Sequence, residues 1–331
     1  MTNIRWKSLN RPELGIANRI SALFARRAWS APDCFPRFRD TKQLIIACDY
    51  SGDAKQYNFR SQTFLMVDGG ALWHWDRLRL RLRADCFKEP RRISFKNVTE
   101  RQRAAALVPF LRAANTLPGV LFTLLVDKRI GSVFQSDDTL DDGGASLWRR
   151  MDAVDRRSRE RLFLMAHSVG LLLSGFSYAG QDVLIISDED AMFANDQRHR
   201  LACELLACVG SHYLTHILGR LQVCTTRSDT GRLDLEDLAA IPDLAGGALS
   251  ECAGVCDGRG GFTPGVLRPV DRSQSEKARA ILAWYAEGWH PLKRIAVLLE
   301  KAPEDRIIAR LLNIVPEAAI PEYNWRRADA Q

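Results

Sequence analysis

The chain has 331 residues, 46% of them hydrophobic, and 47 Lys and Arg against 40 Asp and Glu give a net charge of +7. This composition is typical of a globular protein that buries a core, in one large domain with extensions or in two domains. No apolar run reaches the ~18 residues that cross a bilayer, and the first residues lack an apolar signal-peptide segment, so we expect neither a membrane-spanning nor a secreted protein. Eight cysteines scattered among apolar neighbours predict reduced thiols and a cytoplasmic protein.

The first third of the chain is rich in strand patterns. Residues 1–40 form an expected N-terminal extension with one helical stretch. Short apolar runs that end in turn residues predict strands at 44–49 and 63–67. Leu and Arg alternate between 75 and 83, which fits a strand with one basic face and fits a helix equally well. A further strand is expected at 92–98.

Strands and helices alternate in the remaining sequence. The expected strands are 119–127, 182–187 and 220–224, and the expected helices are 104–114, 147–173, 196–218 and 235–249, the last broken near Pro242. Glycines make 254–265 a linker, and a helical tail is expected over 275–314. The order predicts the α/β class, with one mixed sheet flanked by helices. We place an N-terminal extension at 1–40, the main domain at 41–260 and a helical C-terminal tail at 261–331.

Acidic residues stand where buried strands end. Asp49, Asp127 and Asp188 each follow an apolar run, and Asp243 lies on the late helix. In an α/β sheet, ligands gather at the carboxyl ends of strands. Carboxylates that converge there repel one another unless a cation neutralises them, and their hard oxygens suit Mg²⁺ or Mn²⁺. Each acid alone is also explained as a strand terminator or a helix cap, so only the four together point to a metal site.

Two short motifs stand out among these segments. The first strand runs into Asp-Tyr-Ser-Gly at residues 49–52, and a helix of small residues at 241–249 carries Pro-Asp-Leu. Both resemble motifs of the domain-of-unknown-function 3800 family, a ribonuclease H-like group common in bacteria, whose first strand ends in Asp-Glu-Ser-Gly and whose late helix carries Ala-Asp-Leu. Tyr50 replaces the family's Glu, and Pro242 replaces its Ala. The resemblance covers roughly residues 42–252.

The resemblance implies a ribonuclease H-like fold, a mixed sheet flanked by helices. It also implies an acidic cluster of Asp49, Asp188 and Asp243, with Asp127 as a candidate fourth member. Two Mg²⁺ or Mn²⁺ ions ~3.5–4 Å apart in such a cluster activate water and stabilise the leaving oxygen in phosphodiester hydrolysis. We therefore expect a metal-dependent nuclease acting on DNA or RNA, in which Asp49 bridges both metals while Asp188 and Asp243 each complete one site.

Basic residues cluster in the sequence between 77 and 96. If their side chains lie on the same face as the acids, they would seat a phosphate backbone. A run of charge is also the usual composition of a solvated face. The residues that we assign to nucleic-acid contact are Arg77, Arg79, Arg81, Arg92 and Lys96.

A second hypothesis is a non-catalytic binding or assembly subunit on the same fold, which Tyr50 and Pro242 favour. Its docking surface for a protein partner would be the apolar stripe of the helical tail, and the same stripe would otherwise pack on the chain's own core. The residues of this stripe are Trp284, Tyr285, Leu292, Ile295 and Leu299.

Residue types that bind zinc also occur in two places. The cysteine spacing of the first set does not match a zinc ribbon, whereas that of the second falls within the loose range for zinc ligands, and both rank below the acidic cluster. The first set is His212 and His216 with Cys203 and Cys208, and the second is Cys252 with Cys256.

Overall fold

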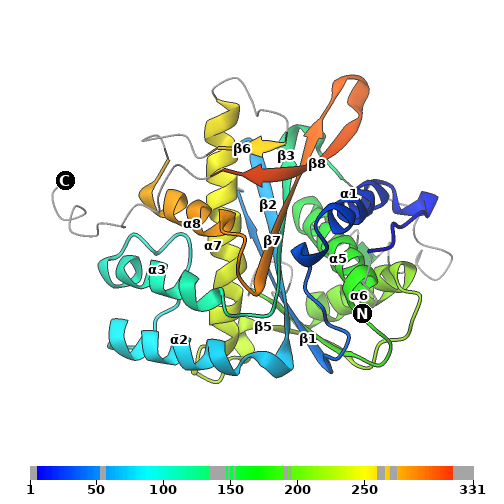
Figure 1. The fold of residues 1–331 in the computed structure, drawn as a ribbon. Helices are drawn as coiled ribbons and strands as arrows, with labels where there is room; N and C mark the ends of the chain where they lie inside the picture. Colours follow the sequence, from blue (N-terminus) through cyan, green and yellow to red (C-terminus); the bar gives the residue numbers. More distant parts are fainter. Residues whose placement is uncertain are drawn as a thin grey trace.

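The structure is a computed structural model that describes residues 6–52, 57–133, 147, 150–151, 154–188, 193, 195–258, 265–268 and 274–315. Its centre is a mixed sheet, whose described strands follow the order β5-β4-β1-β2-β3-β7-β8-β6. Helices cover both faces of this sheet (Figure 1). The predicted class, a mixed α/β protein, is confirmed.

The sheet mixes parallel and antiparallel neighbours. The strands are β1 (Gln43–Ser51), β2 (Phe59–Asp68), β3 (Gly119–Asp127), β4 (Asp182–Ser187), β5 (Leu221–Thr225), β6 (Val266–Leu267), β7 (Leu292–Lys301) and β8 (Ile307–Ile314). β2 is antiparallel to β1 and β3, whereas β4 and β5 continue parallel to β1. On the other side, β7 runs parallel to β3, and β8 is antiparallel to β7.

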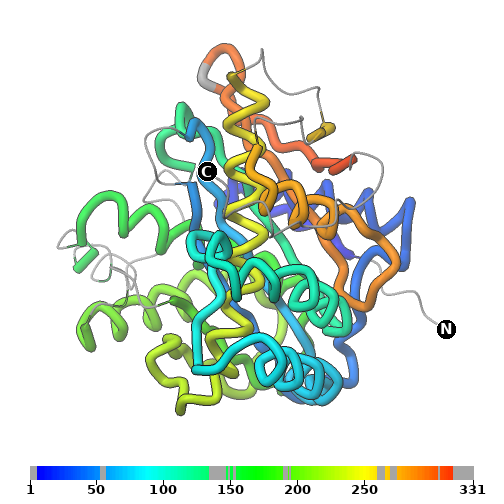
Figure 2. Tube along the Cα trace, turned by 90° about the vertical axis from the view of Figure 1, so that its left-hand side faces the viewer, coloured from blue at the N-terminus to red at the C-terminus, as the bar shows by residue number. Residues whose placement is uncertain are grey.

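The longer helices form one layer on each face of the sheet. They are α1 (Ile16–Ser30), α2 (Trp73–Cys86), α3 (Arg101–Ala114), α5 (Arg156–Phe176), α6 (Asp196–Tyr213), α7 (Asp234–Asp257) and α8 (Glu276–Ala286). Figure 2 looks onto the layer formed by α2, α3, α7 and α8, with α7 running along the middle of the sheet.

Strand β1 shows how the sequence divides the core between the two layers. Successive side chains of a strand point to opposite faces. Leu44, Ile46 and Cys48 pack with α1, α5 and α6, whereas Ile45 and Ala47 pack with α2, α3, α7 and α8. Because both faces are covered, the strand is a continuous apolar run that stops only at Asp49.

Residues 75–83, which fitted a strand and a helix equally well, belong to helix α2. Trp75, Arg79 and Leu82 are its buried residues and recur at helical spacing. Leu80 points outward and is exposed, so the alternation of Leu and Arg in the sequence does not mark two faces of a strand.

The strand expected at 92–98 is absent, and these residues form turns between α2 and α3. Their backbone groups bond to local turns and to side chains instead of to a neighbouring strand. The carbonyl of Arg92 accepts from the Arg103 side chain at 2.7 Å, and the Val98 N–H donates to the Ser94 carbonyl at 3.1 Å. The prediction was wrong because a short apolar pattern does not reveal whether a free sheet edge lies nearby.

The helical tail expected over 275–314 is also wrong in its second half. Helix α8 ends at Ala286, and strands β7 and β8 follow Pro291. β7 pairs with β3 from Gly119 and Leu292 onward, so this segment extends the main sheet. Periodicity misled the prediction because a short continuous apolar run fits a buried strand and a buried helix alike. Residues 316–331 lie outside the described part of the chain.

Helix α7 runs unbroken through Pro242, where a break was expected. Proline removes one backbone donor and usually kinks a helix. Here, nearly every residue from 237 to 250 is buried, and the helix packs on β1 and β2. This tertiary packing outweighs the local penalty.

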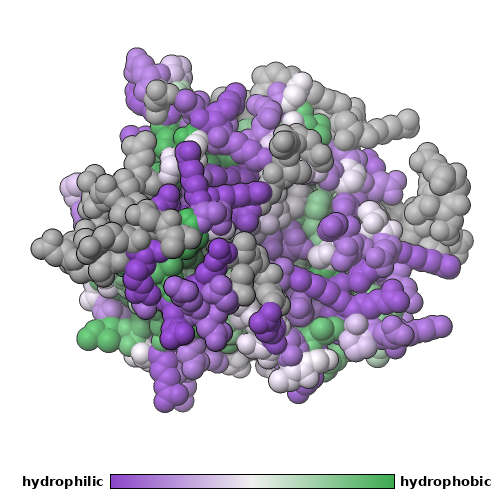
Figure 3. All heavy atoms as spheres, turned by 180° about the vertical axis from the view of Figure 1, so that it is seen from behind, coloured by the Kyte–Doolittle hydropathy of each residue, from purple (hydrophilic) through white to green (hydrophobic). Residues whose placement is uncertain are grey.

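The outer surface is mostly polar on the face opposite to that of Figure 1. Hydrophilic side chains cover most of the coloured atoms there, with small apolar patches between them (Figure 3). None of the described helices combines the length and the apolar character needed to cross a bilayer.

Candidate functional site

Three of the four predicted acids come together at one edge of the sheet. β1 and β4 are parallel neighbours whose register pairs Cys48 with Ser187. Asp49 and Asp188 each follow this pair by one residue, so they lie side by side at the carboxyl ends of the two strands. Asp243 joins them from helix α7, since its charge acts directly on Asp49.

Asp243 reaches the strands because the neighbouring face of α7 carries small residues. A Cβ on Gly246 would lie 2.9 Å from both Ser61 Oγ and Thr63 Oγ1, closer than real side chains approach. The Ser61 hydroxyl donates to the Gly246 carbonyl at 2.9 Å, and the ring of Phe95 packs against Gly247. Thr63 is the register partner of Asp49, so the glycines hold α7 directly over the strand end that carries this acid.

Two of the three aspartates, Asp49 and Asp243, have a raised pKa. Burial raises the pKa of Asp49 well above its usual range, and the charges of Asp243 and Asp188 add to this effect, against a 3.2 Å hydrogen bond from the Ser51 hydroxyl. Burial also raises the pKa of Asp243 to about 6, although its Oδ2 accepts a 2.6 Å hydrogen bond from the Phe95 N–H. Such mutual perturbation is typical of functional sites.

A fourth acid, Glu236, belongs to the cluster and was missed from the sequence. It lies seven residues before Asp243, two turns along the same face of α7. Arg92 bridges it to the cluster, since its Nε lies 2.9 Å from Glu236 Oε2 and its Nη2 pairs with Asp188 Oδ2. Thr226 donates to Asp188 at 3.2 Å. The spacing of seven between two acids of one helix was the available signal.

Positive charge next to these four carboxylates is limited in the described residues. Arg92 contacts two of the acids, and Lys277 lies near Asp243 while its Nζ stands 4.2 Å from the centre of the Phe95 ring. Burial is the main cause that raises the pKa of Glu236, and Arg92 only partly offsets it. Arg92 thus pairs with two of the four acids, while the charges of Asp243 and Asp188 act on Asp49.

The donor set suits a hard divalent cation, but the acids are not yet arranged around one. Across the described part of the chain, no three His, Cys, Asp or Glu side chains are placed to hold a metal ion. In the site itself, the guanidinium of Arg92 stands between Asp188 and Glu236. The four acids supply only carboxylate oxygens, which Mg²⁺ and Mn²⁺ prefer as ligands. Asp188 and Glu236 could bind such an ion only if Arg92 moved away from them.

Asp127 does not join this cluster. Its Oδ1 accepts hydrogen bonds of 2.9 Å from both the backbone and the side chain of Arg129, and Arg129 also lies 3.7 Å from Asp257. Asp127 lies on β3, two strands away from β1. The residue of β3 that is level with Asp49 is Thr123, and Asp127 comes four residues later, a distance of ~13 Å along the strand. It caps the turn after β3 and is ion-paired.

A second arginine–acid cluster lies on the first turn of α7. Arg79 is only 1% exposed, and its guanidinium pairs with Asp76, Asp234 and Asp237, while Arg83 pairs with Asp237 as well. We had assigned Arg79 to nucleic-acid contact, and the structure contradicts this because a guanidinium buried among three carboxylates cannot reach a phosphate.

The other basic residues of that assignment are placed differently. Arg77, Arg81 and Lys96 are exposed, whereas Arg92 faces the acids. The Arg77 guanidinium lies 5.7 Å from the centre of the Trp73 ring. Contact of the exposed residues with nucleic acid stays a prediction.

Neither set of zinc-ligand residue types forms a described site. α6 ends at Tyr213, so His212 and His216 do not share a helix face, and His216 Nε2 hydrogen-bonds to the Ser177 hydroxyl at 2.9 Å. Cys252 is buried on α7, where its sulfur accepts from Gln274 Nε2 at 2.9 Å.

No protein-family model, curated protein or solved structure matches the chain. The resemblance to the domain-of-unknown-function 3800 family therefore rests on the sequence motifs.

Proposed function

We propose that this chain is a divalent-metal-dependent phosphodiesterase that cleaves nucleic acid. One observation carries the proposal: Asp49, Asp188 and Asp243 come from distant parts of the sequence and converge where β1 and β4 end. A buried group of like charges costs stability unless a cation occupies it. The convergence of these carboxylates supports a site for a divalent cation.

The order of the strands supports a ribonuclease H-like fold for this site. The segment β3-β2-β1-β4-β5, with β2 alone antiparallel, is the arrangement of such a fold. Helix α7 follows β5 and returns across the sheet to add an acid. The motif at residues 49–52 and the one around Asp243 then fall on the first strand and on this helix, as the family resemblance implies.

Each acid has a role in this proposal that follows from its position. The charges of both Asp188 and Asp243 act on Asp49, so Asp49 would bridge two ions, while Asp188 and Asp243 would each bind one. A divalent ion supplies Lewis-acid stabilisation of a phosphate and a water of lowered pKa. Glu236 would complete the carboxylate shell where the family's Glu is replaced by Tyr50. The exposed Arg77, Arg81 and Lys96 would hold the phosphate backbone.

Arg92 occupies the position that couples metal binding to substrate binding. When Asp188 and Glu236 bind a metal, Arg92 loses both carboxylate partners. Its planar guanidinium then becomes available for bidentate contact with a substrate phosphate. Until then it compensates part of the negative charge.

A non-catalytic subunit is the second candidate, and Tyr50 is the observation that favours it. Its ring lies beneath the guanidinium of Arg161, 5.7 Å away, so the position of the family's carboxylate holds a cation–π pair. The docking stripe that we assigned to this subunit is wrong, because its residues form core packing of α8 and β7. All are buried: Trp284, Tyr285, Leu292, Ile295 and Leu299.

Titration of Mn²⁺ into the chelator-treated protein tests the proposal. We expect binding that is lost in Asp49→Asn and kept in Asp196→Asn, which removes an exposed acid at the start of α6. Metal-free Asp49→Asn should be at least as stable as the parent, because the change removes a buried charge. Thermal unfolding checks this second expectation.

Cleavage assays on single- and double-stranded DNA and RNA follow with the same three proteins. Activity of the parent and of Asp196→Asn, with none in Asp49→Asn, is the expected pattern. Equal Mn²⁺ binding by parent and Asp49→Asn would overturn the metal site. Absence of Mn²⁺ binding and of cleavage in the parent would favour the non-catalytic subunit.

A further inference from the structure

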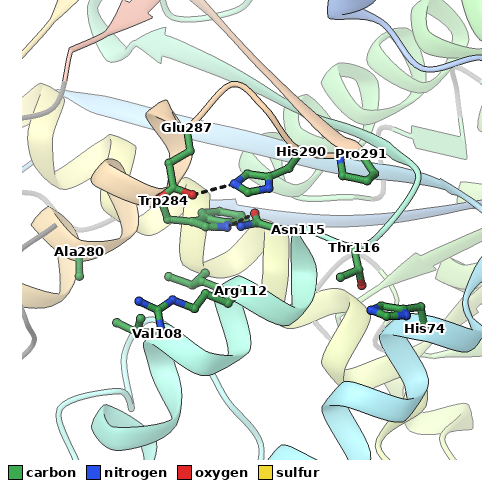
Figure 4. A pocket seen from close by; sticks show the side chains of 11 residues that line it. His74, Val108, Arg112, Asn115, Thr116, Ala280, Trp284, Glu287, His290 and Pro291 are labelled. Atoms are coloured by element: carbon green, nitrogen blue, oxygen red, sulfur yellow. Dashed lines mark hydrogen bonds and ion pairs between the residues drawn. The ribbon is translucent and has the colours of Figure 1, made fainter. Parts of the chain in front are cut away.

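A separate cavity lies at the opposite edge of the sheet from the acids. It has a volume of about 660 Å³ and is enclosed by α2, α3, α8 and the turn that leads into β7 (Figure 4). Pro291 lines it, next to the point where β3 and β7 begin with the pair Gly119 and Leu292. β3 runs parallel to β1. The cavity therefore lies at the end of the sheet where these strands begin, whereas Asp49 lies at the end where β1 finishes.

The walls of the cavity are largely apolar and include one fixed aromatic ring. Val108 and Leu111 of α3 face Ala280 and Trp284 of α8 across it. The Trp284 Nε1–H donates to Asn115 Oδ1 at 2.6 Å, and the Arg294 guanidinium lies 4.2 Å from the centre of the indole ring. These contacts lock the indole, so the wall it forms is preorganised.

The charged groups that line the cavity are one arginine and one glutamate, and they differ in their partners. Arg112 is exposed and makes no hydrogen bond or ion pair with any other described residue. Glu287 is the one carboxylate among the lining residues, and it already lies 3.0 Å from His290 Nε2. Figure 4 shows this pair on one side of Trp284 and Arg112 on the other, with His74 and Thr116 toward the far end.

We propose that this cavity binds a small organic anion in which a carboxylate or phosphate is attached to a flat apolar ring. Arg112 contacts the anionic group, and the ring lies between the apolar walls of α3 and α8, next to the small part of Trp284 that stays exposed. His74 and Thr116 offer hydrogen bonds to polar substituents at the far end. The volume falls within the range of about 300–1,000 Å³ typical of pockets for molecules of this size. The inference does not depend on the proposed nuclease activity.

Two exposed tryptophans adjoin the lining histidines. Trp73 precedes His74 and Trp289 precedes His290, and they are 67% and 94% exposed. Large apolar rings in water are more often found where something binds. The ring centre of Trp73 lies 5.1 Å from that of the lining His74, so this exposed ring stands next to the cavity.

Calorimetric titration in the presence of chelator tests the proposal with matched probes. Adenosine 5′-monophosphate and indole-3-acetate carry both a ring and an anion. Adenosine and indole-3-acetamide lack the anion, while phosphate and acetate lack the ring. We expect at least one of the first pair to bind about tenfold tighter than its neutral and its ring-free counterparts, and which one binds distinguishes a nucleotide from an aromatic acid.

Two variants locate the binding. Arg112→Gln should abolish the preference for the charged probe and leave weak binding of the neutral one, whereas Arg26→Gln, an exposed change on α1, should leave both unchanged. Val108→Trp should fill the cavity and abolish binding of every probe, while thermal unfolding shows that the half-buried site tolerates the change. The proposal is overturned if neither charged probe binds at about 5 mM, or if binding survives in Val108→Trp.

Discussion

Two arginine–acid clusters occupy neighbouring turns of α7, and they balance charge in different ways. In the first, three arginines face three aspartates, and the members are Arg79, Arg83, Arg232, Asp76, Asp234 and Asp237. In the second, four carboxylates share Arg92 and the nearby Lys277. The first cluster has as many arginines as aspartates, whereas the ion pairs described for the second join Arg92 to two of its four carboxylates.

The ratio of arginines to acids distinguishes the structural cluster from the candidate site better than the burial of the acids does. Burial raises the pKa of one aspartate in each cluster, Asp237 in the first and Asp49 in the second. Burial raises the pKa of Asp237 and its partners Arg83 and Arg79 only partly offset this effect, whereas the charges of Asp243 and Asp188 add to the effect of burial on Asp49 and raise its pKa further. An unbalanced cluster persists in a folded protein when function, rather than stability, maintains it.

The largest expected effect comes from breaking the balanced cluster. Arg79→Met should lower the free energy of unfolding by about 3–5 kcal/mol, because it removes a fully buried arginine and leaves the buried Asp237 with Arg83 alone of its two arginine partners. Arg92→Met should cost clearly less, since the Arg92 side chain is 38% exposed and water can solvate the acids it leaves. Urea unfolding of both variants measures the two values. Equal losses would mean that the two clusters do not differ as described.

An intermediate effect is expected where α7 approaches the strands. Gly246→Ala should lower the free energy of unfolding by about 1–3 kcal/mol, because its Cβ would crowd Ser61 and Thr63. It should also weaken Mn²⁺ binding by moving Asp243. Gly210→Ala on α6 is the control, since nothing lies within 4 Å of its Cβ position, and it should gain about 0.5–1 kcal/mol of helix propensity. If Gly246→Ala changed neither the free energy of unfolding nor Mn²⁺ binding, the close approach of α7 to Ser61 and Thr63 would not be what positions Asp243.

The smallest expected effect is a change in the free energy of unfolding with pH. Comparison of the parent with Asp243→Asn gives the part of this change that is due to Asp243. The pKa of Asp243 is raised to about 6 in the folded state, so the folded protein holds this proton more tightly than the unfolded chain does. The metal-free parent should therefore lose stability relative to Asp243→Asn as pH rises from about 4 to about 6. Asp49, Asp188, Arg92 and Lys277 act on the same group. Denaturant unfolding at several pH values gives the slope, and a slope of opposite sign would contradict the raised pKa.

Binding of Mn²⁺ should show the complementary trend. Metal binding needs the carboxylates deprotonated, so the affinity should fall as pH drops below about 6. The pH dependence of Mn²⁺ affinity therefore tests whether the carboxylates that titrate are the ones that bind the metal.

The acids at strand ends were predictable because a single local signal marks them. An apolar run that stops at an acid places that acid at the end of a buried strand, and Asp49 and Asp188 both obey this rule. Asp127 obeys it too, yet it lies two strands away and pairs with Arg129. The rule locates the ends of strands along the chain but does not say which strands are neighbours.

The features that could not be predicted from the sequence depend on contacts between residues that are distant along the chain. Glu236 was missed because its tie to Asp188 runs through Arg92 on another loop. Arg79 was assigned to the surface because the three aspartates that bury it come from two helices. β7 was taken for a helix because only its pairing with β3 distinguishes it from one.

That pairing also has a consequence for synthesis of the chain. β3 is apolar from Gly119 to Val126 apart from Thr123, and the strand that covers its outer edge begins about 170 residues later. At ~5–20 residues per second, a ribosome leaves this edge open for roughly 10–35 s. An unpaired apolar edge of this length is a template for aggregation. The yield of folded protein therefore depends on what shields β3 during that interval, and a transcript truncated before residue 292 leaves the edge open permanently.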